Sequence, residues 1–497
     1  MPDLNAAKPY LAFDFGAESG RAILAHLHSG ILSTQEVRRF KNEPVEYGGS
    51  LHWDVARLWW EVRQALAGLE EVQLAGIGVD TWGVDYALIG EAGELLQNPY
   101  HYRDKRTAGM MAAAFGRVAK EAIYAATGVQ FMPINTLYQL LAAQRETPEL
   151  LRAAKQLLTI PDLFHYWLTG RAACEFTNAS TTQLVDPRTR SWATELIRAL
   201  GLPRHFWSEI VEPGTRLGEL SPALAKGSAL AGTPVIAPAT HDTGSAVAAI
   251  SAKAADGKAF LSSGTWSLLG TELQNPIVTP EAQRLNFTNE GGVNGTTRLL
   301  KNVMGLWMLQ CCRQSWTAQG QCYDHLELVE VAAREAPFIS LVDPDHESFL
   351  RPPDMPAAIA AFCERTRQAK PQSAAACTRA IFESLALKYR LALASLEQLT
   401  GHRMDCIRVV GGGSKNRLLN QMTADATGRK VLAGPAEATA LGNVAVQILA
   451  TGAAGSLEEV RETIERSFPA EVFEPREPEA WERQAGRFES YCEAAYA

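Results

Sequence analysis

The sequence predicts an α/β protein of two similar domains, and three observations support this. At 497 residues the chain is longer than one hydrophobic core ordinarily serves, so two domains of roughly 200–250 residues are expected. Short apolar or β-branched runs that end in small-residue turns alternate with segments of helical periodicity. The same pattern then restarts after residue 250. We therefore expect domains over residues 1–250 and 251–497, with polar small residues around Lys253–Gly257 at the boundary.

The first half is expected to open with two strands, within residues 10–27, around a turn at Gly16–Gly20. Leu11, Phe13 and Phe15 alternate with other residues before the turn, and apolar residues resume after it. Hydrophobic periodicity predicts the remaining elements of this half. They are helices over 58–69, 110–126, 137–152 and 162–168, and strands over 74–80, 153–161 and 234–237.

The second half begins in the same way, since residues 259–261 lead into a Ser/Gly turn and residues 267–270 lead out of it. A long amphipathic helix is expected over 374–399, followed by a strand over 406–410. A further helix is expected over 439–449. The stretch beyond Glu458 is rich in Glu and Arg, which indicates one or two solvated helices.

Composition excludes several classes of protein. Hydrophobic residues make up 46% and charged residues 21% of the chain, as in globular proteins. The net charge of −8 argues against nucleic acid or an anionic membrane as the main partner. No apolar run of about 18 residues and no signal-peptide pattern is found. The eight cysteines form no Cys-x-x-Cys pair, so reduced thiols and a cytoplasmic location are expected.

Four small-residue loops carry the candidate chemistry, and each follows a short apolar run. They are residues 13–21, 238–245, 261–266 and 409–414. Two of them hold an Asp, Asp14 and Asp242, beside Gly/Ser turns of a size that suits a phosphate group. A nucleotide-dependent phosphotransferase requires such a set.

The first and third loops are candidate phosphate sites. Glycines at both ends of Gly16–Gly20 let backbone N–H groups approach an anion, and Asp14 can hold Mg²⁺ directly or through water. Glu18 is expected to point away, because its carboxylate would repel phosphate. Ser263–Thr265 offers hydroxyls and amides in the same manner. A tight hairpin and an ordinary polar loop are the competing structural interpretations.

The second and fourth loops are candidates for the base and the nucleoside site. Asp242 ends a strand between the two halves, where its carboxylate could accept a hydroxyl proton during phosphoryl transfer. The alternative is an N-capping Asp on a helix that begins at Gly244. The run Gly411–Gly413 has no side chains, which would let the backbone pass flat against a ligand. The alternative is a strained strand-to-helix turn. No Walker loop and no Gly-x-Gly-x-x-Gly turn occurs, so another phosphate-binding architecture is required.

Taken together, these segments resemble the FGGY carbohydrate kinases, members of the actin, Hsp70 and sugar-kinase fold, from about Leu11 to Gly452. The segments most similar to the L-rhamnulose kinases of that family are residues 78–86, 102–104, 135–140, 287–292 and 300–307. Many sister kinases carry a Lys and a Trp around the positions of Thr136 and Gln139. Their absence argues against glycerol, xylulose or gluconate as the substrate.

The resemblance implies two RNase-H-like domains with an interdomain cleft, and transfer of the γ-phosphoryl group of Mg-ATP to the 1-hydroxyl of L-rhamnulose. Residues 1–250 would bind sugar and supply the first phosphate loop, and residues 251–497 would bind nucleotide. Asp242 would be the catalytic proton acceptor and Asp14 would serve the Mg²⁺ ion. Nucleotide contacts are implied for Ala17, Glu18, Ser19, Gly20, Arg21, Thr265, Gln310 and Gly412, and sugar contacts for Gly83, His241, Asp242, Thr243 and Asn302.

Two alternative functions stay open at this point. One is a sister kinase that acts on L-fuculose or another ketose, because a few pocket contacts of about 1–3 kcal/mol each decide sugar specificity. The other is a non-catalytic sugar-sensing relative. The presence of Asp14, Asp242, Thr265 and Gly412 argues against a sensor, as does the lack of a basic helix-turn-helix extension.

Overall fold

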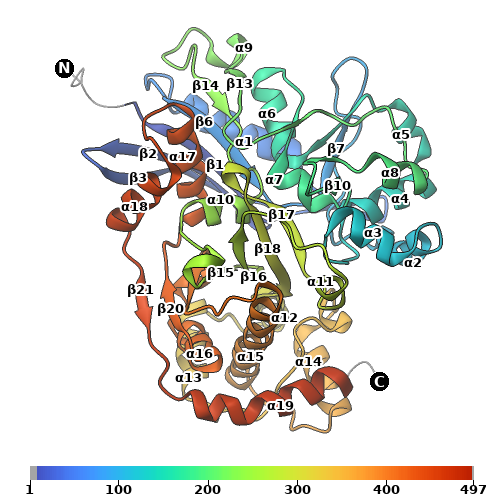
Figure 1. The fold of residues 1–497 in the computed structure, drawn as a ribbon, viewed down its shortest axis with the longest axis vertical. Helices are drawn as coiled ribbons and strands as arrows, with labels where there is room; N and C mark the ends of the chain where they lie inside the picture. The colour runs from blue at the N-terminus through green and yellow to red at the C-terminus, as the bar shows by residue number, and fades with distance from the viewer. Residues whose placement is uncertain (1–7, 495–497) are drawn as a thin grey trace. The chain divides into compact units, whose positions relative to one another are not determined.

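The computed structural model describes residues 8–494, and the chain divides into two compact units (Figure 1). Unit 1 consists of Met1–Ser251, Glu272–Leu299 and Ala438–Pro469, and unit 2 of Ala252–Thr271, Leu300–Glu437 and Ala470–Ala497. The assignment of sugar binding to residues 1–250 and of nucleotide binding to residues 251–497 remains a prediction.

Unit 1 is built on a six-stranded sheet with the strand order β13-β14-β6-β1-β2-β3. Its strands are β1 (Tyr10–Phe15), β2 (Ser19–His28), β3 (Ile31–Lys41), β6 (Gly76–Thr81), β13 (Arg216–Glu219) and β14 (Pro234–Ile236). β1 pairs antiparallel with β2 and parallel with β6, and β6 pairs parallel with β14. The carboxyl ends of β14, β6 and β1 therefore meet at one edge of the sheet, where α/β proteins usually bind ligands.

Helices from the middle of the chain and from its C-terminal part pack on this sheet. All six residues of β1 are buried, as expected for a parallel strand with both faces covered. Contacts on the sheet come from α6 (Ile160–Thr169), α10 (Asp242–Ala248), α17 (Ala438–Ala450) and α18 (Leu457–Ser467). Figure 1 shows α17 and α18, in red, beside the blue strands β1–β3.

Two long helices expected in this unit are each broken, so those two predictions were wrong. Residues 110–126 form α2 (Met110–Phe115) and α3 (Lys120–Thr127), with Gly116 after the first helix. Residues 137–152 form α4 (Thr136–Glu146) and α5 (Pro148–Ala153), because Pro148 cannot donate a backbone hydrogen bond inside a helix. The other elements of unit 1 are β4 (Val45–Tyr47), β5 (Ser50–His52), α1 (Val55–Ala67), β7 (Tyr86–Ile89), β8 (Gln156–Thr159), β9 (Cys174–Glu175), α7 (Phe176–Ala179), β10 (Val185–Asp186), β11 (Ser191–Trp192), α8 (Thr194–Ala199), β12 (Ile210–Val211), α9 (Pro222–Ala225), α11 (Pro280–Arg284) and β17 (Thr288–Gly291).

The second large sheet has seven strands in the order β17-β18-β16-β15-β19-β20-β21. Its further strands are β15 (Lys258–Ser263), β16 (Trp266–Leu273), β18 (Thr297–Met304), β19 (Cys406–Val410), β20 (Lys430–Ala433) and β21 (Glu471–Phe473), and the helices of unit 2 are α12 (Trp307–Ala318), α13 (His325–Ala333), α14 (Met355–Arg365), α15 (Ala374–Thr400), α16 (Arg417–Thr427) and α19 (Pro478–Ala494). β15 pairs antiparallel with β16 and parallel with β19. This repeats the pairing of β1 with β2 and β6, which confirms the expected restart of the pattern.

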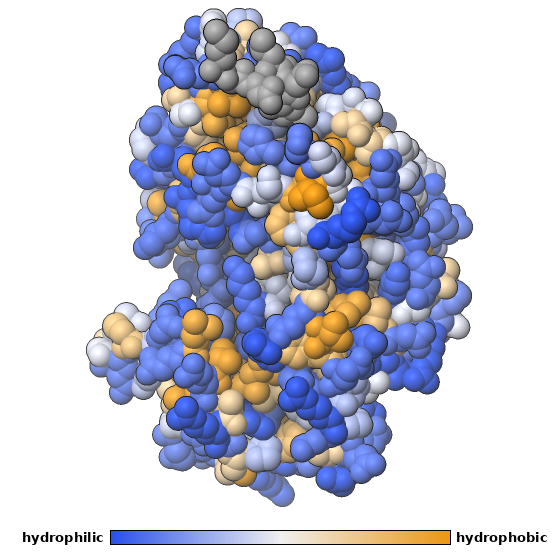
Figure 2. All heavy atoms as spheres, turned by 90° about the vertical axis from the view of Figure 1, so that its left-hand side faces the viewer, coloured by the Kyte–Doolittle hydropathy of each residue, from blue (hydrophilic) through white to orange (hydrophobic). Residues whose placement is uncertain are grey.

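The surface agrees with the composition. The face in Figure 2 is mainly hydrophilic, with small hydrophobic patches between hydrophilic side chains. Across residues 8–494, no helix is both long and apolar enough to cross a membrane. All eight cysteines are free thiols.

Candidate active site

Three carboxylates stand at the carboxyl edge of the first sheet. Asp14 lies near the end of β1 and faces Asp80 of β6 in the parallel register. Asp242 is the first residue of α10, which follows β14. The Thr81 N–H donates to the Thr240 carbonyl at 2.9 Å, so the loop before Asp242 continues the edge of the sheet. The sequence singled out Asp14 and Asp242 as candidate residues but assigned no role to Asp80.

Asp242 presents one oxygen that is engaged and one that is open. Oδ1 accepts the Thr243 N–H at 2.5 Å and the Thr243 hydroxyl at 3.2 Å, and lies 3.4 Å from His241 Nε2. Among residues 8–494, no hydrogen bond or ion pair engages Oδ2. Burial raises the pKa of Asp242 and the Asp14 charge adds to this effect, while His241 opposes it. The side chain remains 32% exposed, so a substrate can reach it.

The capping interpretation of Asp242 is not supported. His241, not Asp242, occupies the N-cap of α10, and it makes no side-chain capping bond. The helix also begins two residues earlier than expected, because the first turn includes Asp242 and Thr243. A carboxylate at this helix end is favoured by the helix dipole, but its open oxygen leaves it available for chemistry.

Another buried carboxylate, Glu175, fixes the backbone that leads to Asp242. Glu175 accepts hydrogen bonds from the Thr240 N–H at 2.8 Å and the Thr240 hydroxyl at 2.7 Å. It also accepts from the N–H and hydroxyl of Thr177 at 2.8 and 2.5 Å. Burial raises the pKa of Glu175 to about 7 in spite of these donors. No local sequence signal identified Glu175, because Thr240, the partner that connects it to the loop before Asp242, lies 65 residues further along the chain.

Asp14 and Asp80 differ in their partners. Arg21 donates from Nε and Nη2 to Asp14 Oδ2 at 3.0 and 2.7 Å, and Asn443 Nδ2 donates to Asp80 Oδ2 at 2.6 Å. Asp80 Oδ1 is buried without a hydrogen-bond partner in the described part of the chain. Burial, followed by the charge of Asp14, raises the pKa of Asp80 well above its usual value.

The first glycine loop is the tight hairpin between β1 and β2. The Gly16 N–H donates to the Ser19 carbonyl at 2.9 Å, and Asn42 Nδ2 donates to the Gly16 carbonyl at 2.8 Å. A Cβ at Gly20 would lie 2.2 Å from the Phe40 ring, so only glycine fits there. Glu18 is exposed at the tip of the loop. This hairpin and the proposed phosphate contacts are compatible, because a hairpin tip leaves amides exposed.

Gly83 lies in the segment after β6 and packs closely on the 3₁₀ helix Ser180–Thr182, which follows α7. A Cβ on Gly83 would lie 2.9 Å from Thr181 Oγ1, and that hydroxyl also accepts the Val84 N–H at 2.9 Å. Val84 has a φ of 65°, which is rare for a β-branched residue. The next residue, Asp85, is buried and accepts the indole N–H groups of Trp53 and Trp82 at 2.6 and 2.9 Å. Burial raises the pKa of Asp85 to about 7.

In unit 2, Thr265 and Gln310 come together at the start of α12. The backbone N–H of Trp307 donates to the Thr265 carbonyl at 3.2 Å, and Gln310 Nε2 lies 3.5 Å from Thr265 Oγ1. Gly305 permits this approach, because a Cβ there would lie 2.7 Å from the Gly264 carbonyl oxygen. Gln310 Oε1 is buried without a hydrogen-bond partner among residues 8–494.

The three glycines after β19 differ in their surroundings. A Cβ on Gly413 would lie 2.0 Å from Ser263 Oγ, and one on Gly411 would lie 3.0 Å from the Ser263 carbonyl oxygen. Gly411 also has a φ of 80°. A Cβ on Gly412 would meet nothing within 4 Å. Gly411 and Gly413 therefore serve the packing of the loop on β15, and Gly412 is the glycine that faces open space.

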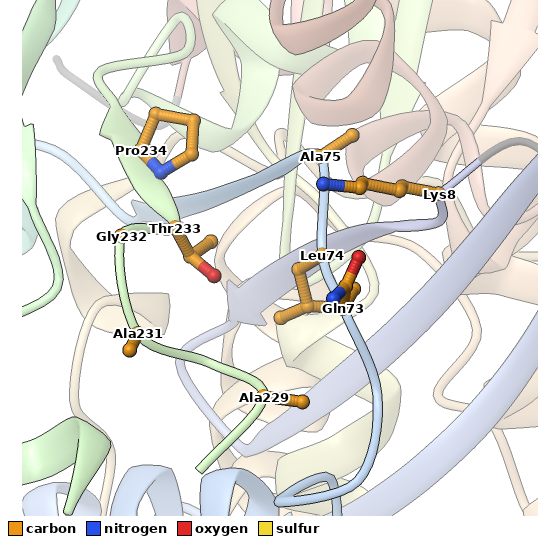
Figure 3. Close-up of a pocket in the computed structure, with 9 residues that line it drawn as sticks. All are labelled: Lys8, Gln73, Leu74, Ala75, Ala229, Ala231, Gly232, Thr233 and Pro234. Atoms are coloured by element: carbon orange, nitrogen blue, oxygen red, sulfur yellow. The ribbon is translucent and has the colours of Figure 1, made fainter. Parts of the chain in front are cut away.

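The structure thus gathers Asp14, Gly83, His241, Asp242 and Thr243 at one edge in unit 1. Thr265, Gln310 and Gly412 lie in unit 2, as does Asn302 on β18. A separate pocket of about 250 Å³ lies before the amino ends of β6 and β14 (Figure 3). It is lined by Lys8, Gln73, Leu74, Ala75, Ala229, Ala231, Gly232, Thr233 and Pro234. It contains no carboxylate and lies at the end of these strands away from Asp80 and Asp242, so it is not the candidate site.

Comparison with known proteins agrees with this architecture. The N-terminal domain of the FGGY family of carbohydrate kinases matches residues 9–249, and the C-terminal domain of that family matches residues 259–451. A rhamnulokinase of Bacteroides thetaiotaomicron is 44% identical over 478 residues, which cover 95% of this chain and 97% of that protein. A rhamnulokinase of Pectobacterium carotovorum is 43% identical, with 95% of this chain and 94% of that protein covered.

Solved structures support the same fold. A ligand-bound xylulose kinase from Lactobacillus acidophilus superposes with a TM-score of 0.81 at 18% identity, and covers 99% of both chains. A glycerol kinase of Plasmodium falciparum with ADP gives a TM-score of 0.77 at 16% identity, and covers 99% of this chain and 98% of that one. At such identities the likeness concerns the fold alone. From the two domain matches and the full-length relatives it follows that this chain belongs to the FGGY family of carbohydrate kinases.

Proposed function

We propose that this chain transfers the γ-phosphoryl group of ATP to the 1-hydroxyl of L-rhamnulose, forming L-rhamnulose 1-phosphate and ADP in L-rhamnose catabolism. The observation that carries the proposal is Asp242, whose Oδ2 is open at the carboxyl edge of the sheet. Relatives named as rhamnulokinases at 40–44% identity over 92–95% of the chain support the choice of sugar. The chain would work in the cytoplasm on small molecules, without a nucleic-acid or membrane partner.

In the proposed reaction, Asp242 Oδ2 accepts the proton of the sugar 1-hydroxyl while that oxygen bonds to the γ-phosphorus. The bond between the γ-phosphorus and the bridging oxygen breaks, and ADP leaves with the bond's electrons. Two contacts from Thr243 hold Asp242 Oδ1, so the carboxylate cannot rotate freely away from the acceptor. Positioning of this kind provides much of the rate in phosphoryl transfer.

Substrate contacts are proposed on the same basis. Gly83, His241, Thr243 and Asn302 would contact sugar. Residues 251–497 and the first loop would together bind the nucleotide. The residues in contact with it would be Ala17, Glu18, Ser19, Gly20, Arg21, Thr265, Gln310 and Gly412. Two features favour the nucleotide residues of unit 2: the open space at Gly412 and the unpaired amide oxygen of Gln310.

The residues at the sheet edge fit a Mg²⁺ ion. Asp14 would hold it, and the nearby Asp80 offers a buried oxygen that has no hydrogen-bond partner in the described part of the chain. No group of three or more His, Cys, Asp or Glu side chains among the described residues is arranged to hold a metal. That suits Mg²⁺, which usually takes one or two carboxylates and completes its shell with phosphate and water. When bound it would neutralise charge on the phosphates, and Arg21 would then share Asp14 with it.

The test is ADP release with Mg-ATP and a panel of L-rhamnulose, L-fuculose, L-xylulose, L-ribulose and glycerol. We expect preference for L-rhamnulose, and loss of turnover by at least about 10²–10⁴-fold in Asp242→Asn with ATP binding retained. Asparagine keeps the oxygen that accepts from Thr243, so the fold should persist. Preference for another ketose would change the assigned sugar and leave the assignment as a kinase unchanged. Full activity of Asp242→Asn would remove Asp242 as the base, and ATP binding without turnover of any sugar would favour a sensor.

A further inference from the structure

A buried ion pair stands behind His241, on the side of the ring away from Asp242. Glu290 in β17 and Arg298 in β18 are 5% and 0% exposed at their side chains, and Arg298 Nη2 lies 3.2 Å from Glu290 Oε2. Arg298 Nε also donates to the Gly291 carbonyl at 2.7 Å. Both residues belong to unit 1 together with His241 and Asp242. Neither residue has a place in the proposed function so far.

Both members of the pair reach the same nitrogen of His241. His241 Nδ1 lies 3.2 Å from Glu290 Oε2, an acceptor, and 3.2 Å from Arg298 Nη2, a donor. The other ring nitrogen, Nε2, lies 3.4 Å from Asp242 Oδ1. The imidazole therefore connects the ion pair to the proposed base through its two nitrogens.

We propose that Glu290 and Arg298 are positioning residues that hold the His241 ring with an Nε2–H group on Asp242 in either protonation state of the ring. When the ring is neutral, Nδ1 accepts from Arg298 and Nε2 carries the proton. When the ring takes up a second proton, Nδ1–H donates to Glu290 and Nε2–H stays in place. The ring need not turn between the two states, because a donor and an acceptor are both present beside Nδ1.

The electrostatics of the pair agree with this arrangement. Burial alone would raise the pKa of Glu290, but His241 and Arg298 outweigh it and hold the pKa below its usual value. Glu290 is therefore an anion that faces the ring. Asp242 and Glu290 are the carboxylates next to His241, and Glu175 and Glu272 act on Arg298 from further away. An ion pair that served stability alone would not have to contact His241, whereas Glu290 and Arg298 both do.

The test is a double-mutant cycle with Glu290→Gln, His241→Gln and their combination, and it rests on the proposed kinase activity. Each protein is assayed for kcat and for the KM of L-rhamnulose and of ATP. We expect Glu290→Gln to lower kcat by about 10–100-fold, as the loss of outer-shell positioning does at other sites, with the KM of ATP within about threefold. In the His241→Gln background the same change should alter kcat by less than about threefold, because the ring through which it acts is gone. Equal effects in both backgrounds would overturn the inference.

A matched control separates positioning from stability. Glu272 and Arg461 form another buried pair in unit 1, with side chains 3% and 5% exposed and an Nη2 to Oε2 distance of 2.8 Å. Glu272→Gln should lower the melting temperature about as much as Glu290→Gln does, and leave kcat within about twofold. An equal loss of kcat in Glu272→Gln would also overturn the inference.

Removing one charge of a buried pair can prevent folding. If Glu290→Gln does not yield folded protein, Glu290→Gln/Arg298→Gln takes its place in the cycle, since it leaves no unpaired charge. The outcomes remain separate from those of the proposed function. A wild-type protein that does not turn over L-rhamnulose contradicts the function, whereas turnover with additive effects contradicts only the role of the pair.

Discussion

Replacing Gly442 with Ala tests whether the packing of α17 on α10 sets the position of Asp242. A Cβ at Gly442 would lie 1.7 Å from the Ser245 carbonyl oxygen and 2.5 Å from its carbon. The first distance is half the 3.4 Å at which ordinary contact begins. Both atoms belong to backbone, so no side chain can turn away to make room. The two helices must therefore separate by more than 1 Å or bend locally.

The two opposing effects have known sizes. Alanine gains about 1 kcal/mol of helix propensity over glycine, whereas forcing an atom into a packed contact costs about 1–3 kcal/mol and more when backbone must move. We expect a net loss of about 2 kcal/mol. Ser245 lies one turn after Asp242 in α10, so the base should move with the helix. A displacement of about 1 Å at a reacting group can lower kcat by about 100-fold.

The assay is thermal unfolding together with kcat for L-rhamnulose at saturating ATP. Gly486→Ala is the control, because Gly486 also lies within a helix but a Cβ there would meet nothing within 4 Å. That variant should be slightly more stable than wild type with unchanged kcat. A Gly442→Ala protein with an unchanged melting temperature and kcat within twofold of wild type would refute the packing argument.

Three further predictions concern other parts of the site. Asp85→Asn should destabilise the protein by about 3 kcal/mol in thermal unfolding. Both carboxylate oxygens of Asp85 accept from buried N–H groups, and the NH₂ group of asparagine would place a donor against one of these donors. An unchanged melting temperature would contradict this. Gly413→Ala should raise the KM of ATP and lower the melting temperature through collision with Ser263 Oγ, whereas Gly412→Ala, with open space, should leave the melting temperature unchanged. Glu175 has a folded pKa of about 7 against an ordinary 4.5, so its stabilising effect is complete below about pH 4.5 and is lost as pH rises through 7. In urea unfolding from pH 5 to 8, the free energy of unfolding of the wild type should fall by up to roughly 3 kcal/mol relative to that of Glu175→Gln. Parallel curves of unfolding free energy against pH would contradict the shift.

The parts of this fold that depend on neighbouring residues could be predicted from the sequence. Strand, turn and glycine signals placed the hairpin at Gly16–Gly20, the loop before Asp242 and the triple glycine after β19. The long helix α15 was also located within a residue at each end. Each of these features is encoded by residues that are neighbours in the sequence, where periodicity and turn chemistry act directly.

The parts that were missed depend on distant partners or weak patterns. β3 carries mostly exposed or half-buried residues, so it lacks the apolar alternation that marks a strand. Asp80 accepts a hydrogen bond from Asn443, which lies 363 positions later. Glu290 lies beside His241 only in the folded protein. A single sequence contains no signal that pairs such residues. Gly116 and Pro148 are local signals for a break, but the apolar spacing continues across both positions, and that periodicity predicts one helix where the structure has two.

The return of residues 438–469 to unit 1 has a consequence for how the protein is made. A ribosome releases Asp80 long before it releases Asn443, which donates to it, and Gln447, which donates to the Leu11 carbonyl. The first sheet therefore lacks its covering helix α17 until residues 438–450 have been synthesised. During that interval the buried strand β1 has one face exposed, and chaperones would have their longest opportunity to bind there. A chain truncated before Ala438 would contain Asp14, Asp80 and Asp242 and would still be unable to complete the first unit.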